Sequence, residues 1–180
     1  VRLDMRFMDS EIACAAVLRG EVELAIITLP PQVELPLTAR PLWSDPLAAV
    51  AARAHPLVAR SPVLPDQMED YPAILPGEGT FTRRIIEEGM ARAGVHPPVA
   101  FATNFLETIK MMVVVGLGWS VLPRTMLDRE LVELHIDGLR LERTLGAVRH
   151  TSHTLSNAAK ALSVILRGAP SSSPLNSPIE

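Results

Sequence analysis

The sequence predicts an α/β fold that contains parallel strands, and two observations support this class. Apolar runs with strand character alternate with amphipathic helical segments in two separate parts of the chain. At the start, a strand, a helix and a second strand fit within residues 1–27, which is the spacing of a βαβ unit. A length of 180 residues with 48% hydrophobic content is enough for one domain or for two small lobes that share a crossover.

The first βαβ unit is predicted from short local signals. Residues 1–8 alternate between apolar and polar side chains, so we expect a half-buried strand. Asp9 and Ser10 form a helix-start signal, and apolar residues at helical spacing follow them. Gly20 suits the left-handed conformation that ends a helix. The apolar residues 22–27 then predict a short buried strand.

The same alternation returns in the middle of the chain. Residues 73–76 are predicted to form a short strand, and the helical pattern after the "GEGT" turn ends at Gly94. Residues 98–103 form the next predicted strand, and Asn104 opens the next helix. Before these elements, the apolar residues 46–58 predict a strand that ends at a proline.

The last elements are a strand at residues 144–150 and an amphipathic helix at residues 156–167. From Gly168 onward the chain is rich in proline and serine, and we expect this tail to be disordered.

A pair of glycines, Gly116 and Gly118, lies between a predicted helix and the predicted strand "WSVLP". A dinucleotide-binding loop has the opposite order, with the strand first and the helix after the glycines. We therefore expect a helix stop, with a positive φ at Gly116 and a better tolerance of alanine at Gly118. Ser120 lacks the following glycine of a nucleophile elbow.

Other candidates for chemistry are weak. Cys14 lies in an apolar helical pattern and is expected to be an inert packed thiol, although a histidine distant in sequence could still reach it. His150 and His153 have metal-ligand spacing but no third ligand nearby, which favours solvated loop histidines. His55 is expected to have a structural role. We expect no catalytic residue, no metal and no cofactor.

Charge limits the partners of this segment. The net charge is −3, and lysine and arginine are scattered along the chain rather than gathered in a basic stripe, so we expect no DNA binding by the segment itself. Arg83 and Arg84 stand beside Glu87 and Glu88 on one predicted helix, which favours a solvated charged face with i,i+4 pairs. No apolar run is long enough for a membrane span, and a single cysteine fits a reducing compartment.

Polar side chains stand at the predicted helix starts. They are the pairs Asp9–Ser10, Gly79–Thr80 and Thr103–Asn104, and Thr28 follows a predicted strand. In open α/β sheets, ligands bind beyond the carboxyl ends of strands, and the free N–H groups of a helix start favour anions such as carboxylates. The alternative is that these residues are ordinary helix caps.

Four segments in this order and spacing carry a resemblance to a known family. They are "LRGEVELAII", "DPLAAVAARAHPL", "FATNFLETIKMMVVVGLGWSVLP" and "TLGAVRH" followed by "TLSNAAKAL". Together they resemble the effector-binding domain of LysR-type transcriptional regulators, from residue 1 to residue 167.

The resemblance implies a two-lobed, periplasmic-binding-protein-like (type 2) α/β domain with mixed sheets and two crossover strands. Residues 1–47 and 145–167 would form the first lobe, residues 48–144 the second lobe, and residues 168–180 a disordered tail. A small effector, often a carboxylate-bearing metabolite, would bind in the cleft between the lobes and control transcription by the full-length protein. The residues that match the family's site by position are Ser10, Thr28, Thr80, Phe81, Thr103 and Asn104.

The same resemblance implies a homodimer or tetramer in the cytoplasm. It implies contact with DNA only through an N-terminal winged helix-turn-helix, which does not precede residue 1, so we expect an N-terminally truncated domain that lacks its first strand and helix. Two alternatives on the same fold stay open: a solute-binding protein of a transporter, and an enzyme such as a dehydratase or deaminase. An enzyme would need a fixed acid, base or nucleophile, where the sequence offers hydroxyls and amides.

Overall fold

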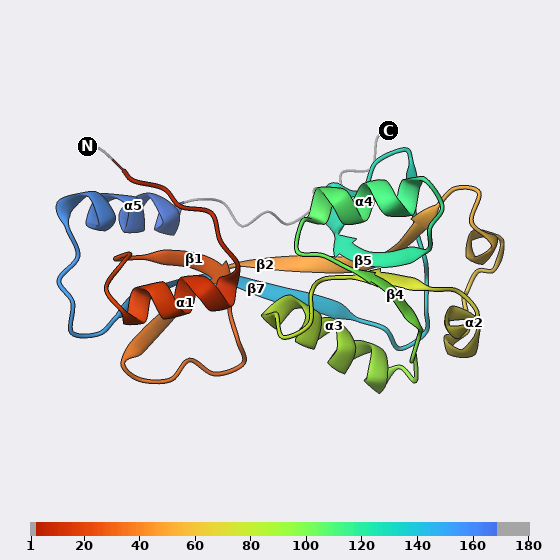
Figure 1. Cartoon of the computed structure of the whole chain (residues 1–180), viewed down its shortest axis with the longest axis horizontal. Helices are drawn as coiled ribbons and strands as arrows, with labels where there is room; N and C mark the ends of the chain where they lie inside the picture. The colour runs from red at the N-terminus through yellow and green to blue at the C-terminus, as the bar shows by residue number, and fades with distance from the viewer. Residues whose placement is uncertain (1–2, 169–180) are drawn as a thin grey trace. The chain divides into compact units, whose positions relative to one another are not determined.

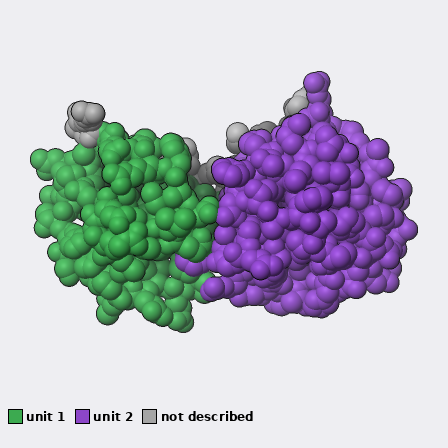
Figure 2. Space-filling view, in the orientation of Figure 1, with its two compact units in different colours: residues 1–45, 144–180 green, residues 46–143 purple. Residues whose placement is uncertain are grey.

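The computed structural model describes residues 3–168 and divides the chain into two compact units (Figures 1 and 2). Unit 1 comprises Val1–Asp45 and Thr144–Glu180, and unit 2 comprises Pro46–Arg143. The tail that the sequence predicts to be disordered lies outside the described residues from residue 169 onward. The described residues form seven strands in the hydrogen-bonded order β1-β7-β2-β5-β3-β4, with β6 paired to β2.

Unit 1 contains helix α1 (Ser10–Leu18), strand β1 (Ala25–Thr28) and helix α5 (Asn157–Gly168). Strand β1 runs antiparallel to β7 (Leu141–His150). Asp9 occupies the N-cap position of α1, and Gly20 follows the helix with a φ of 72°. The predicted helix and its glycine stop are therefore confirmed, and the strand predicted at 22–27 begins three residues later.

The strand predicted at residues 1–8 is wrong in its described part. Residues 3–8 form no regular secondary structure. Met5 is 69% exposed and Phe7 is 92% exposed, so the apolar side of the alternation is not buried. A strand needs a hydrogen-bonding neighbour as well as an alternating pattern, and none of the described strands pairs with this segment.

Unit 2 is built on a mixed sheet. The second half of β2 (Leu37–Ala52) runs antiparallel to β5 (Trp119–Pro123) and to β6 (Leu131–Glu133). Strand β3 (Ala73–Leu75) runs parallel to both β5 and β4 (Val99–Ala102). The predicted α/β class with mixed pairing is therefore confirmed. The strand predicted at 46–58 begins earlier, at Leu37, and ends at Ala52.

Two helices cover opposite faces of this sheet (Figure 1): α3 (Phe81–Arg92) and α4 (Leu106–Val114). Strand β2 is buried on both faces from residue 47 to 52, and its alternate residues enter two different cores. Leu47, Ala49 and Ala51 share a core with Ile86 of α3, whereas Ala48 and Val50 share one with Ile109 of α4. Burial of each large aliphatic side chain stabilises the fold by about 1.5–3 kcal/mol.

Four short elements were not predicted from the sequence. They are strand β6, helix α2 (Pro65–Glu69) and the 3-10 helices η1 (Pro56–Ala59) and η2 (Arg124–Met126). Helix α4 also begins two residues later than predicted, because Phe105 rather than Asn104 or Thr103 is its N-cap residue.

The structure contradicts one prediction about the two glycines after α4, namely that Gly118 tolerates alanine better than Gly116. Gly116 has a φ of 87° and its amide donates to the carbonyl of Val113, which confirms the helix stop. A Cβ on Gly116 would meet open space, whereas a Cβ on Gly118 would lie 2.3 Å from the backbone oxygen of Pro72. Gly118 is therefore the less tolerant position, because β5 approaches the start of β3 closely there.

Candidate functional site

The turn after β3 brings predicted site residues together around Gly77. The amide of Gly77 donates a hydrogen bond to Asn104 Oδ1 over 2.7 Å, and the hydroxyl of Thr80 donates to the Gly77 carbonyl over 2.9 Å. Two side chains that are 24 positions apart in the numbering therefore hold both polar groups of one glycine. We call residues 76–80 together with Thr103 and Asn104 the unit 2 turn.

The position of Thr103 follows from the parallel pairing of β3 and β4. Leu75 lies opposite Ala102, so both strands end at the same edge of the sheet. The Thr103 amide donates to the Leu75 carbonyl over 3.2 Å, and its hydroxyl accepts from the Phe105 amide over 3.4 Å. The predicted convergence of strand-end residues at one edge is therefore present within unit 2.

Thr80 also caps a helix. Its hydroxyl accepts from the Arg83 amide over 3.2 Å, and Phe81 is the first residue of α3. The Thr80 hydroxyl therefore both caps α3 and holds the turn, so it connects the loop to the positive end of the α3 dipole. Asn104, in contrast, is exposed and does not cap α4.

Arg83 also supports the unit 2 turn, and this role was not predicted from the sequence. Its side chain is only 6% exposed; Nη1 donates to the carbonyl of Pro76 over 2.9 Å, and Nε pairs with Glu87 over 2.7 Å. The expected i,i+4 pair is confirmed, but the expected solvated face is wrong for Arg83. The signal in the sequence was an arginine in the first turn of a helix that follows a Pro-Gly loop. A backbone carbonyl of that loop needs a hydrogen-bond donor, and the arginine can supply it.

In unit 1 the structure brings Ser10 and Thr28 together. The Ser10 hydroxyl accepts a hydrogen bond from the Thr28 amide over 3.2 Å. Thr28 is the last residue of β1 and is 4% exposed, and Ser10 is the first residue of α1. Asp9, not Ser10, is the N-cap residue. The Ser10 hydroxyl instead links the helix start to the strand end. We call this pair the unit 1 turn.

The other polar candidates have structural roles in the described residues. Ser120 is fully buried and donates to the Ile74 carbonyl. His55 Nδ1 accepts from the Leu57 amide, and burial lowers the pKa of its imidazole, which confirms the structural role. Burial, together with the Glu11 carboxylate, raises the pKa of the Cys14 thiol, which makes it a poor nucleophile.

The His150 and His153 rings stack at a centroid distance of 3.9 Å. Among residues 3–168, no group of three or more histidine, cysteine or acidic side chains has the arrangement of a metal site. In the same residues, no helix combines the length and apolar character needed to cross a membrane.

Strand-end turns that offer amides, hydroxyls and a helix N-terminus are typical of ligand-binding α/β domains. The family model for the LysR substrate binding domain matches residues 1–170, and the chain belongs to this family.

Curated relatives agree with this assignment. The chain is 30% identical over 175 residues to the HTH-type transcriptional regulator CbbR of Rhodospirillum rubrum, covering 94% of this chain and 57% of the relative. It is 29% identical over 158 residues to a RuBisCO operon transcriptional regulator of Acidithiobacillus ferrooxidans, covering 85% of this chain and 51% of the relative. The chain thus spans about half the length of the curated relatives it matches.

Solved structures show the same fold. The regulatory domain of CcmR from Synechocystis PCC6803, in complex with 2-PG, superposes with a TM-score of 0.76 at 26% identity, covering 88% of this chain and 78% of that one. The effector-binding domain of QuiR, in complex with shikimate, gives a TM-score of 0.78 at 20% identity, covering 88% and 77%. The predicted two-lobed, periplasmic-binding-protein-like class is therefore confirmed.

Proposed function

We propose that this chain senses a small carboxylate-bearing metabolite for a LysR-type transcriptional regulator, and that the unit 2 turn holds the carboxylate. The observation that carries the proposal is the Asn104–Gly77–Thr80 network at the N-terminus of α3. Backbone amides at a helix start, together with the positive end of its dipole, suit an anion. Two members of the fold, CcmR and QuiR, were solved with small molecules bound.

The roles of the site residues follow from their contacts. Thr80 and Asn104 hold the loop in one shape, and Thr103 joins it to the end of β3. Phe81 is half-buried at the start of α3 and would pack against the apolar part of the ligand. In the unit 1 turn, Ser10 and Thr28 would supply the same kind of hydroxyl contact.

The test is calorimetric titration of the chain with shikimate and a panel of other small organic acids. We expect one acid to bind, and Asn104→Ala to weaken its binding by about 0.5–3 kcal/mol, because the Gly77 loop loses its anchor. Asn157→Ala is the matched control, since Asn157 begins helix α5 in unit 1 and is exposed.

The outcome that would refute the site is specific. If Asn104→Ala and Thr80→Val both lower the melting midpoint but every measured affinity stays unchanged, these residues are caps and turn anchors only.

For the full-length protein we propose a cytoplasmic, homo-oligomeric regulator that is not an enzyme. It would contact DNA through a winged helix-turn-helix outside this chain, as the HTH-type names of the relatives suggest. The 180-residue chain itself should give no salt-dependent shift of DNA in a gel at physiological ionic strength. Sedimentation at tens of micromolar tests whether the chain self-associates.

A further inference from the structure

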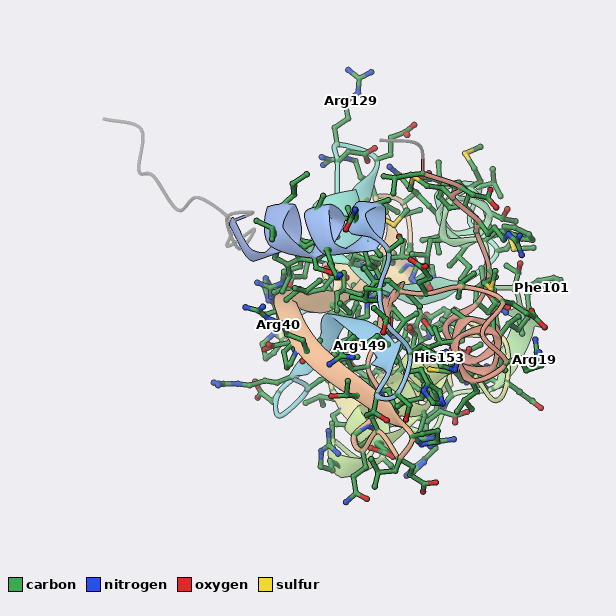
Figure 3. The ribbon with its side chains drawn as sticks, turned by 90° about the vertical axis from the view of Figure 1, so that its left-hand side faces the viewer. Arg19, Arg40, Phe101, Arg129, Arg149 and His153 are labelled. Atoms are coloured by element: carbon green, nitrogen blue, oxygen red, sulfur yellow. The ribbon has the colours of Figure 1, made fainter. Side chains whose placement is uncertain are left out.

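Unit 1 contains a cavity of about 480 Å³ that involves none of the predicted site residues. It is lined by residues from the first half of β2, from the end of β7 and from α5, all of which belong to unit 1. In Figure 3, Arg40 and Arg149 project from the neighbouring strands β2 and β7 below helix α5. A volume of this size lies in the range of small-molecule sites, which is roughly 300–1,000 Å³.

The lining combines apolar and cationic side chains. Its apolar members are leucines, alanines and one valine, whereas its charged members are all basic: Arg40, Arg149 and Lys160. No carboxylate is found among the described residues that line the cavity. Such a lining matches a ligand that has an apolar body and an acidic group.

Within residues 3–168, no acidic side chain forms an ion pair with these three cations. Among the described residues, neither Arg40 nor Lys160 forms an ion pair or side-chain hydrogen bond. Arg149 donates only to a backbone carbonyl, that of His150, over 3.3 Å. Three like charges around one cavity repel each other, and a bound anion would reduce this repulsion.

The geometry of the strands places the cavity-lining residues on one face of each strand. Residues 38, 40 and 42 of β2 alternate along the strand and therefore project from the same face, as do Ala147 and Arg149 of β7. Lys160, Ser163 and Val164 share a face of α5 at helical spacing. A ligand in the cavity would thus contact both the strands and the helix.

We propose that this cavity is a second ligand site that binds a small organic anion, with a ring or short chain as its apolar body and a carboxylate directed at Arg40, Arg149 and Lys160. The site goes beyond the proposed effector function, because none of its residues belongs to the unit 1 turn or the unit 2 turn. A ligand here binds independently of the metabolite held at the unit 2 turn.

The test uses the 180-residue chain and two probes of nearly equal shape, 2-naphthoate and 2-naphthamide, in calorimetric titrations. We expect 2-naphthoate to bind, and we expect the uncharged 2-naphthamide to bind at least about tenfold more weakly. Arg40→Gln and Lys160→Gln should each weaken 2-naphthoate by about three- to tenfold and leave the amide unaffected.

Two controls separate this site from others. Arg129→Gln removes an exposed arginine from unit 2 (Figure 3) and should leave the affinity for 2-naphthoate unchanged. Asn104→Ala should also leave it unchanged, which distinguishes the cavity from the unit 2 turn. Because Arg40 and Lys160 are exposed, the variants should keep the wild-type melting midpoint.

Three results would overturn the proposal. They are the absence of any binding of 2-naphthoate, equal affinity of acid and amide, and a loss of binding in Asn104→Ala but not in Arg40→Gln. Equal affinities would indicate contact with an apolar surface alone, and the last result would place the anion at the unit 2 turn.

Discussion

The unit 2 turn and the unit 1 turn both use hydroxyl side chains but differ in how these side chains hold the backbone. In unit 2, side chains of Asn104, Thr80 and Arg83 each bond to the backbone of residues 76 or 77. In unit 1, the bond from Thr28 to Ser10 over 3.2 Å is the contact that joins helix and strand end. Three side chains therefore hold the loop in unit 2, whereas in unit 1 the Ser10 hydroxyl connects the helix start directly to the strand end.

The way in which the unit 2 turn is held bears on the affinity of a ligand bound there. A loop that is already held in its binding shape loses little conformational entropy when a ligand arrives, so contacts there convert more fully into affinity. We therefore infer that the unit 2 turn supplies the fixed carboxylate position of the proposed site.

The largest expected effect concerns the support of the unit 2 turn. Gly118→Ala would place a Cβ 2.3 Å from the Pro72 oxygen, just before the strand that carries the turn, and should cost about 3 kcal/mol of unfolding free energy. Gly116→Ala, in open space at a φ of 87°, should cost about 1 kcal/mol. Urea unfolding of both variants measures the difference, and equal losses would show that β5 and the start of β3 can separate.

The second effect concerns the buried guanidinium. Arg83→Met removes the donor to the Pro76 carbonyl and should cost about 2 kcal/mol, because that carbonyl loses its buried partner. The partner Glu87 is half-exposed, so its lost ion pair adds little. Arg84→Met, at the exposed neighbouring position, should cost less than about 0.5 kcal/mol. Similar losses in both variants, measured by urea unfolding, would mean that the turn does not depend on Arg83.

The smallest effects compare the two turns directly by thermal unfolding. Asn104→Ala should cost about 1 kcal/mol, since the Gly77 amide loses its acceptor. Ser10→Ala should cost about 0.5 kcal/mol or less, because alanine in the first turn of a helix partly offsets the lost bond. A larger loss for Ser10→Ala than for Asn104→Ala would contradict the inference that its three side chains hold the unit 2 turn firmly.

Local patterns predicted most of the fold. Helix ends at Gly20, Gly94 and Gly116 have the positive φ that their positions implied, and the alternation of strands and helices gave the class. The pattern failed at residues 3–8, because an alternating segment becomes a strand only beside a partner. It also misjudged Gly118, whose constraint comes from Pro72, a residue 46 positions earlier.

The site was predictable in its residue types but not in its support. Thr80, Thr103 and Asn104 were identified because helix starts after strands are recognisable in sequence. Arg83 was assigned to a solvated face because a sequence does not show which turn of a helix lies under a loop. The cationic cavity of unit 1 was also missed, since Arg40, Arg149 and Lys160 come from three distant segments.

The interrupted path of unit 1 has a consequence for the order in which the protein folds. Unit 2 is one continuous segment, so all of its strands are available once the chain through Arg143 has emerged from the ribosome. Strand β1 must wait for β7, because Thr28 pairs with Leu145, and closing so long a loop carries an entropic cost that local contacts do not. We therefore infer that during synthesis unit 2 folds first, and that unit 1 closes when the chain beyond residue 144 pairs with it.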